Sequence, residues 1–375
     1  MITHIELKNF KCFIDESFDV APLTVFTGIN GMGKSSCIQS LVLLKQSFES
    51  TLLQNKNQVD LNNKSYIDLE TASDLCNTNA YPRNLDIIYE SDATGKHQWK
   101  IDASKTKETI LNASYIGNKQ YENDALFQKD FIYLTAERLG PRKDYNRKAD
   151  RVFNTKLGVQ GELTPTYIFD AIKNNEIIGI ESLKHPDVTG NQLYENLNAW
   201  ISDILGRNIT TKVSEIDTQN VKLSFNIKGS RATEFSALQV GFGFSFSLPV
   251  ILAPLVAKPG DLIIIENPEA HLHPSAQTKI GKLLALAAQN GVQIIIETHS
   301  DHLINGIRLI VKGDEKLGQL DAEKVLIHFF NSEYVDSSIG NDKKKTLRIK
   351  QNGKLDGWPK GFFDEWESNL RKLLQ

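Results

Sequence analysis

Residues 23–36 read Leu-Thr-Val-Phe-Thr-Gly-Ile-Asn-Gly-Met-Gly-Lys-Ser-Ser, and the rest of the chain is interpreted from this stretch. Its first five residues are apolar or β-branched and predict a short strand over 23–27. From residue 36 to residue 48 the apolar side chains recur at helical spacing and predict a helix. The glycine-rich segment between them therefore joins a strand to a helix.

This segment runs from Gly28 to Ser35 and follows the pattern Gly-x-x-x-x-Gly-Lys-Ser without a gap. Its glycines let successive backbone N–H groups face one phosphate, and the helix N-terminus adds partial positive charge. Lys34 is expected to reach the β- and γ-phosphates and Ser35 to bind Mg²⁺, so ATP and Mg²⁺ are the expected cofactors. A glycine loop with a chance Lys-Ser is disfavoured by the strand and helix around it. The predicted nucleotide contacts here are Gly28, Asn30, Gly31, Gly33, Lys34, Ser35 and Ser36.

The composition is that of a chain with a hydrophobic core, since 40% of the 375 residues are hydrophobic and 24% are charged. Lys plus Arg number 43 and Asp plus Glu number 46, so no overall positive charge draws the chain to nucleic acid. Three scattered cysteines exclude a disulfide framework and a thiolate zinc site, and predict a cytoplasmic protein. The apolar run 248–257 is too short to cross a membrane.

Alternating segments predict further strands before and after the loop. Residues 2–7 and 15–20 are candidates, residues 50–80 are predicted as a loop, and residues 84–118 as an antiparallel meander. Residues 131–135 predict a short strand and 164–206 a mainly helical region. From residue 325 the tail alternates strand and turn and ends in an amphipathic helix. The fold class is therefore α/β, with a mixed central sheet.

A second chemical signal is a continuous aliphatic strand, 262–265, that ends in Glu266. A buried carboxylate without a partner is costly, and a metal ion or the hydroxyl of Ser35 would remove that cost. Glu266 is therefore a predicted Mg²⁺ ligand with Ser35. Residues 292–297 form another buried-type strand, which is followed by Thr-His-Ser. His271 and His273 lack a third ligand nearby, so packing and helix capping are favoured for them over metal binding.

Three motifs occur in a fixed order: the loop at 28–35, Glu-Asn-Pro-Glu-Ala-His-Leu-His-Pro at 266–274, and Glu-Thr-His-Ser at 297–300. Together with Leu-Lys-Asn-Phe-Lys-Cys-Phe at 7–13, they resemble the ABC-type ATPase heads of the RecF, SMC and OLD group. The resemblance implies a P-loop head over 1–310 with a helical lobe inserted at about 139–235. It also implies a metal role for Glu266 and a γ-phosphate switch role for His299.

The tail, Gly-Trp-Pro-Lys-Gly-Phe-Phe-Asp at 357–364, resembles a small C-terminal domain of unknown function, which we expect over 311–375. That domain caps a subset of these ATPases. Members of the subset and its relatives occur in bacterial anti-phage systems such as Septu, where a separate subunit is the nuclease.

The sequence departs from the group at Asn267, where ABC-type ATPases carry a glutamate as general base. An amide cannot take a proton from water. Either Glu269 acts as the base or hydrolysis is slow and the protein is chiefly an ATP-dependent switch. We favour slow hydrolysis with Glu269 contributing.

ABC-type heads sandwich ATP in a dimer, between one subunit's phosphate loop and the partner's Leu-Ser-Gly-Gly-Gln loop. That string is absent from the sequence. Its expected window holds Gly241, Gly243 and Ser245 before a predicted helix, and these residues could present N–H groups and a hydroxyl to a γ-phosphate. The alternative is a tight loop whose glycines serve backbone geometry alone. The Q-loop role would fall near 135–138.

The resemblance predicts an ATP-dependent homodimer or higher oligomer that switches a partner effector, a nuclease subunit, in anti-phage defence. The alternatives are a RecF-like DNA-binding ATPase of DNA repair and a non-hydrolysing ATP-dependent scaffold. A transporter ATPase is disfavoured by the missing signature string. A built-in metal nuclease is disfavoured because no Asp-x-Asp triplet follows His299. DNA contact would use basic tracts at 138–151 and 343–350, although each tract alone is better explained as a solvated face.

Overall fold

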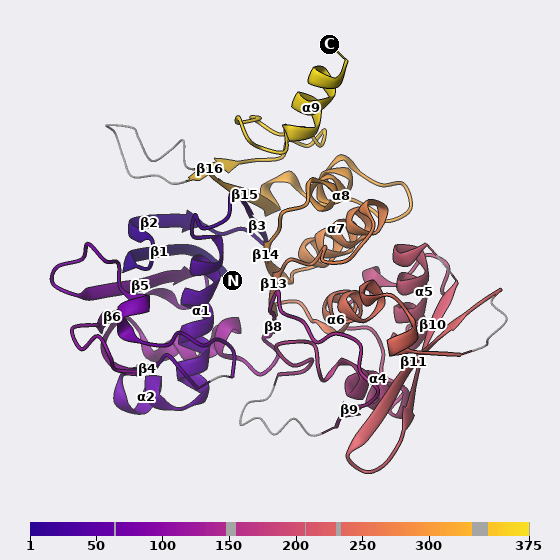
Figure 1. Ribbon diagram of the computed structural model, residues 1–375, viewed down its shortest axis with the longest axis horizontal. Coiled ribbons are helices and arrows are strands. Elements are labelled where there is room, and N and C mark those ends of the chain that lie inside the picture. Colours follow the sequence, from indigo (N-terminus) through magenta and orange to yellow (C-terminus); the bar gives the residue numbers. More distant parts are fainter. Residues whose placement is uncertain (64, 148–154, 207, 230–233, 332–343, 375) are drawn as a thin grey trace.

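The computed structural model describes the chain except residues 64, 148–154, 207, 230–233, 332–343 and 375, and except the side chains of 365–368. Figure 1 shows a central sheet that separates a lobe of strands around one helix from a lobe rich in helices. The central sheet has six strands in the order β16-β15-β3-β14-β13-β8. All neighbours pair in parallel except β16, which lies antiparallel at the edge. The strands are β3 (Leu23–Gly28), β8 (Ile132–Leu134), β13 (Leu262–Glu266), β14 (Gln293–Glu297), β15 (Val325–Phe330) and β16 (Lys344–Leu347).

Helices cover both faces of this sheet, which explains why β13 and β14 are continuously aliphatic and buried along their whole length. One hydrophobic core joins the sheet to the helices of the right-hand lobe, and a second core joins it to α1 (Lys34–Glu49). The helix after the loop thus begins at Lys34, two residues earlier than predicted, because Gly33 serves as its N-cap. The helices on the opposite face are α6 (Phe242–Val256), α7 (Pro274–Gln289) and α8 (Asp301–Lys312).

An antiparallel sheet packs against α1 in the order β2-β1-β5-β6-β7-β4. Its meander confirms the alternating pattern predicted over 84–118. The predicted loop at 50–80 contains short elements that Asn and Ser clusters concealed in the sequence: α2 (Leu52–Lys56), β4 (Gln58–Asp60) and α3 (Ala72–Leu75). The remaining strands are β1 (Ile2–Phe10), β2 (Phe13–Asp19), β5 (Asn84–Ser91), β6 (Gly95–Asp102) and β7 (Ile110–Ile116).

The residues predicted as a helical lobe hold two helices and a small sheet. The sheet runs β10-β11-β12, and β9 also pairs with β11. Strand β10 was not predicted, because its apolar positions are few and the helical pattern before it dominates. The elements are β9 (Tyr145–Asn146), α4 (Thr164–Lys173), α5 (Leu193–Leu205), β10 (Ile209–Glu215), β11 (Asn220–Ile227) and β12 (Phe235–Ser236).

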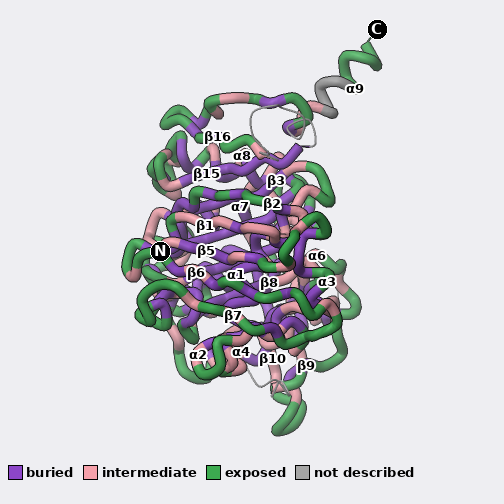
Figure 2. The backbone as a smooth tube through the Cα atoms, turned by 90° about the vertical axis from the view of Figure 1, so that its left-hand side faces the viewer, coloured by how far each residue is buried: buried purple, intermediate pink, exposed green. Residues whose placement is uncertain are grey.

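The C-terminal part of the chain adds β15 and β16 to the central sheet before it ends in a helix. Strand β15 pairs with β3 from Val325 opposite Leu23 to Phe330 opposite Gly28. After β16 comes α9 (Glu365–Leu373), which extends away from the body in Figure 2. None of the helices in the described part of the chain is long and apolar enough to span a membrane.

Candidate nucleotide-binding site

The glycine loop lies at the carboxyl end of β3, where open α/β sheets place their ligands. Gly28, Gly31 and Gly33 have φ angles of +123°, +76° and +108°, which side chains disfavour. A Cβ at Gly28 would lie 2.1 Å from the carbonyl oxygen of Phe330 in β15. The same oxygen accepts a 3.0 Å hydrogen bond from the N–H of Ile29. Strand β15 therefore supports the start of the loop.

The ammonium group of Lys34 folds back onto the loop. Its Nζ donates to the carbonyl oxygens of Gly28 at 3.0 Å and Ile29 at 2.8 Å. Burial lowers the pKa of Lys34, and the nearby carboxylate of Glu297 opposes that shift. The cation is thus held at the centre of the loop, where an incoming phosphate would meet it.

A cavity of about 220 Å³ opens at this loop. It brings together the contacts predicted in the glycine loop apart from Gly28, and it adds three residues that were not predicted. Its lining comprises Lys11, Cys12, Asn30, Gly31, Gly33, Lys34, Ser35, Ser36 and Glu297.

Lys11 and Cys12 reach the cavity from the turn between β1 and β2. Lys11 has a φ angle of +49°, and its Nζ donates a 2.5 Å hydrogen bond to Oε1 of Gln39 on α1. Burial lowers the pKa of Lys11. A second lysine thus lines the cavity at the phosphate loop. The resemblance of residues 7–13 to the first turn of ABC-type heads was the available signal.

Two carboxylates end the neighbouring strands β13 and β14, where Glu266 pairs directly with Glu297. Both oxygens of Glu266 are occupied: Oε1 accepts from the Tyr133 hydroxyl at 2.9 Å and Oε2 from the N–H of Ala136 at 3.3 Å. Burial raises the pKa of Glu266. Burial also raises the pKa of Glu297 to about 7; Ser35 and Lys34 oppose the shift, and Glu266 adds to it.

Glu297 was missed although its signal was present: like Glu266, it is a carboxylate at the end of a buried aliphatic strand. Its Oε2 is buried and has no hydrogen-bond partner among the residues that the structure describes. Within those residues, no three His, Cys, Asp or Glu side chains group closely enough to hold a metal ion by themselves. Two carboxylates, the Ser35 hydroxyl and the phosphates of a nucleotide are, however, the oxygen donors that Mg²⁺ prefers. The residues therefore fit a Mg²⁺ ion that arrives with a nucleotide.

The segment after Glu266 folds back onto the end of β14. Asn267 has a φ angle of +45°, and its N–H donates to the carbonyl of Glu297 at 2.8 Å. Glu269 accepts from the Thr298 hydroxyl at 2.8 Å and from the N–H of His299 at 2.7 Å. His299 is exposed at the surface, but the protein around its ring removes part of its hydration; this desolvation and the charge of Lys34 lower the pKa of His299. Glu269 and His299, predicted from separate motifs, are therefore neighbours.

Arg138, in the predicted Q-loop window, is buried beneath this segment. Its guanidinium donates to the carbonyls of Thr135 at 3.1 Å, Glu266 at 2.7 Å and Asn267 at 2.6 Å. Burial lowers the pKa of Arg138 to about 10, while Glu269 and Glu266 oppose the shift. Arg138 thus fastens the end of β8 to the end of β13 and is not available to DNA.

The predicted trans-acting residues lie at the start of α6. Gly241 is the exposed N-cap residue, and a Cβ there would meet no atom within 4 Å. Gly243 packs closely, because its Cβ would lie 2.7 Å from the carbonyl oxygen of His271. Ser245 is buried with 7% of its surface exposed. Gly241 is therefore the one of the three that is most open to a partner.

The two histidines of the second motif have structural roles, as favoured from the sequence. The ring of His271 packs against Phe242 and Phe246 at centroid distances of 5.8 and 4.6 Å. His273 caps α7, and its Nδ1 accepts from the N–H of Ser275 at 3.3 Å.

The basic tracts are partly engaged within the chain. Arg147 forms ion pairs with Glu215 at 2.7 Å and Asp170 at 3.5 Å, and Lys344 pairs with Glu16. Lys148, Arg151 and Lys343 lie outside the described residues. The candidates left exposed are Arg142, Lys143, Lys345, Arg348 and Lys350.

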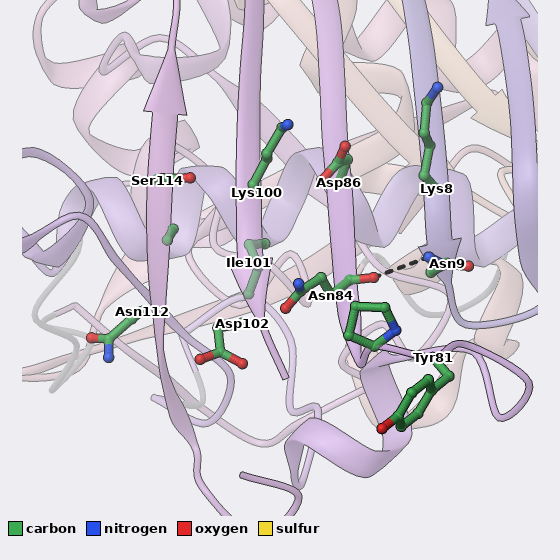
Figure 3. Close-up of a pocket in the computed structure, with 12 residues that line it drawn as sticks. Lys8, Asn9, Tyr81, Asn84, Asp86, Lys100, Ile101, Asp102, Asn112 and Ser114 are labelled. Atoms are coloured by element: carbon green, nitrogen blue, oxygen red, sulfur yellow. Dashed lines mark hydrogen bonds between the residues drawn. The ribbon is translucent and has the colours of Figure 1, made fainter. Parts of the chain in front are cut away.

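A larger cavity of about 640 Å³ lies on the outer face of the antiparallel sheet. Figure 3 shows Lys8, Asp86 and Lys100 side by side on neighbouring strands, with Asn9 donating to the carbonyl of Asn84 at 3.1 Å. These charges alternate and compensate one another. None of the predicted site residues lines this cavity, so its size does not identify it as the nucleotide site.

A family model described as "AAA domain, putative AbiEii toxin, Type IV TA system" matches residues 23–305. The chain belongs to this AAA-domain family. The match begins at β3 and ends within α8, so it contains the phosphate loop and both acidic strands. A second model, described as "Protein of unknown function (DUF3696)", matches residues 320–373.

The AAA domain shares its fold with solved SMC heads. An SMC head bound to the C-winged helix domain of ScpA has a TM-score of 0.52 at 10% identity, covering 93% of this chain and 97% of that one. An Smc head from Pyrococcus furiosus, with an extended coiled coil and bound to the C-terminal domain of ScpA, has a TM-score of 0.51 at 9% identity, with coverages of 100% and 99%. These similarities confirm the predicted fold class. No curated protein matches the chain. Family and fold together support a P-loop ATPase of the AAA and SMC-head type.

Proposed function

We propose that this AAA-domain protein binds ATP with Mg²⁺ in the loop cavity, hydrolyses it slowly and uses the bound nucleotide to switch a partner. One observation carries the proposal: Lys34 is buried at the centre of a glycine loop, and among the described residues its ammonium group bonds to that loop's carbonyls alone. These carbonyl bonds are replaceable by phosphate oxygens, which attract an ammonium group more strongly.

Each predicted residue has a distinct task in this proposal. The backbone of residues 28–36 cradles the phosphates, and Lys34 neutralises the charge on the β- and γ-phosphates. Ser35 and Glu266 hold Mg²⁺, which would supply further charge neutralisation at the phosphates. His299, exposed beside Lys34, contacts the γ-phosphate side of the site.

Slow hydrolysis follows from the side chain at position 267, because the amide of Asn267 cannot act as a general base. Glu269 takes that role two residues later. Its carboxylate is bonded to Thr298 and to the backbone of His299, so it lies at the same edge as the γ-phosphate switch.

The proposed partner is inferred from the description of the matching family and from the solved SMC heads. The family description names a toxin of a toxin–antitoxin system, and the SMC heads were solved with ScpA domains bound. We propose that ATP closes a dimer through the loop at 241–245 and that closure licenses a nuclease subunit in anti-phage defence.

The nucleotide part is tested by Lys34→Ala. This change removes the cation from the loop, and we expect ATP affinity to fall by about a hundredfold or more, since charge-assisted bonds contribute about 1.5–3 kcal/mol each. Calorimetric titration with a non-hydrolysable ATP analogue measures the affinity, and thermal unfolding checks that the variant is folded. Exposed Lys119→Ala is the control. Equal affinity in the Lys34 variant and the wild type would refute the assignment.

A further inference from the structure

We propose that Glu297 supplies a carboxylate oxygen to the divalent cation that accompanies the nucleotide. The inference rests on the proposed function and adds a residue to its metal site. It assigns Glu297 alongside Ser35 and Glu266, at a position where the sequence motifs point only to the following histidine.

Glu297 lies nearer in the sheet to the phosphate loop than Glu266 does. Strand β14 lies between β3 and β13, so Glu297 pairs with Phe26 on one side and with Glu266 on the other. Neighbouring strands are about 4.8 Å apart. The backbone of Glu297 is therefore one strand from the strand that carries the loop, and that of Glu266 is two strands away, at roughly 10 Å.

The cavities confirm this difference between the two carboxylates. Glu297 lines the cavity of about 220 Å³ that also contains Lys34 and Ser35. Glu266 lines a separate cavity of about 350 Å³, which it shares with Tyr133 and Gln39. Of the two carboxylates, Glu297 is thus the one that faces the phosphate loop.

The carboxylates of Glu266 and Glu297 also differ in their hydrogen bonds. Each oxygen of Glu266 already accepts one hydrogen bond, Oε1 from the Tyr133 hydroxyl and Oε2 from the N–H of Ala136. Glu297 is 6% exposed, and its Oε2 makes no hydrogen bond to any described residue. A buried carboxylate oxygen in this condition requires a cation or a proton.

A cation near Glu297 within the protein, the ammonium group of Lys34, is already engaged. Lys34 lies near Glu297, but its Nζ donates to two loop carbonyls and is directed to phosphate in the nucleotide-bound state. The hydroxyl of Ser35 lies beside the Glu297 carboxylate. A Mg²⁺ ion held by Ser35 is therefore the cation placed to meet the free oxygen of Glu297. Glu266, which also accepts from Tyr133, would be the second carboxylate available to that ion.

The test measures how much MgCl₂ is needed for half-maximal binding of a fluorescent non-hydrolysable ATP analogue. We compare wild type, Glu297→Gln, Glu297→Ala and the matched variant Glu266→Gln. Loss of an outer-shell partner of a metal ligand already weakens metal binding by roughly 10–100-fold, and loss of a ligand should cost at least as much. Both Glu297 variants should therefore need at least about tenfold more MgCl₂, while their analogue affinity in EDTA equals that of the wild type.

A second readout is independent of nucleotide affinity. Mn²⁺ replaces Mg²⁺ at such sites, and the paramagnetic resonance of free Mn²⁺ reports its binding to the protein–analogue complex. Thermal unfolding without nucleotide tests folding, and Glu297→Gln should be at least as stable as the wild type because it removes a buried charge. An unchanged MgCl₂ requirement in both Glu297 variants, with a shift only in Glu266→Gln, would overturn the inference and leave the proposed function intact. Failure of the wild type to bind the analogue in either condition would overturn both.

Discussion

Among single side chains, Glu269 connects two motifs that are thirty residues apart in sequence. Its two carboxylate oxygens accept hydrogen bonds from the Thr298 hydroxyl and the His299 N–H. The carboxylate thereby fixes the backbone that presents His299 next to Lys34. Glu269 can serve as general base, as a positioning residue for His299, or as both, and these roles are separable by mutation.

Glu269→Gln is expected to slow hydrolysis by about a hundredfold or more, because a general base typically contributes 10²–10⁴ in rate. ATP binding should persist, so nucleotide accumulates on the protein. Single-turnover hydrolysis and equilibrium binding of ATP measure the two effects. Thr298→Val removes the hydroxyl partner but keeps the carboxylate, and it is the control for a purely positioning role. Hydrolysis by Glu269→Gln at the wild-type rate would exclude Glu269 as the base.

The residues of the loop could be predicted because the chemistry is written in consecutive positions. Gly28 to Ser35 come together through local geometry alone, and most of them line the cavity. Glu297 reaches the same cavity because β14 pairs with β3, and Lys11 reaches it from the turn between β1 and β2. Each had a local signal in the sequence, but that signal does not say which elements become neighbours, so only the structure placed these two residues at the loop.

Among the elements, β15 comes from the C-terminal part of the chain and pairs with β3 from the N-terminal part. Its His328 is fully buried and stacks on Phe26 of β3 at 5.4 Å. The Nε2 of His328 lies 2.8 Å from the carbonyl oxygen of Asp19, and Nδ1 lies 3.1 Å from the Thr346 hydroxyl. One imidazole thus joins β2, β3, β15 and β16. Burial lowers the pKa of His328 to about 4.

This shift predicts a loss of stability in acid. The folded state holds His328 neutral, whereas the unfolded chain protonates near pH 6.5, so stability falls as pH drops below about 6.5 and the loss is complete near pH 4. This difference in the pKa of His328 lowers the free energy of unfolding by about 3 kcal/mol over that pH range. Urea unfolding of wild type and His328→Gln at pH 7.5 and pH 4.5 measures it. The variant should lose less stability between the two values; an identical loss would show that other groups cause the acid sensitivity.

Whether a helix or strand could be predicted from the sequence depended on its length and on the regularity of its apolar pattern. Strands β13 and β14 were predictable because they are uniformly aliphatic, and the meander because it alternates. Strand β10 and the short elements within 50–80 were not, since their burial depends on how they pack against the preceding helices α5 and α1. The pairing of β15 with β3 was equally invisible, because nothing in either strand specifies its neighbour.

For the whole molecule, the arrangement leaves the start of α6 open to a second subunit. Gly241 is exposed, and a Cβ added there would have no atom of the described residues within 4 Å. Gly243, two residues on, is pressed against the backbone of His271 and cannot be enlarged without disturbing the fold. The chain therefore offers one position at which the proposed dimer interface can be blocked cleanly.

Light scattering with and without a non-hydrolysable ATP analogue tests the dimer. The mass of the wild type should double on addition of the analogue with Mg²⁺. Gly241→Glu should still bind the analogue through its own intact phosphate loop, although more weakly than the dimerising wild type, and it should remain monomeric because its side chain projects where the partner would lie. A wild type that stays monomeric at saturating analogue would rule out the sandwich, and a dimeric Gly241→Glu would place the interface elsewhere.

The support that β15 gives to the phosphate loop also bears on the order of events during synthesis. The loop leaves the ribosome early, but the strand against which Gly28 and Ile29 pack is made about 290 residues later. At about 5–20 residues per second, that delay is on the order of 15–60 s. A nascent chain therefore carries its phosphate-binding motif long before it can complete the site. In the proposed function, ATP would stabilise the complete site after β15 has docked.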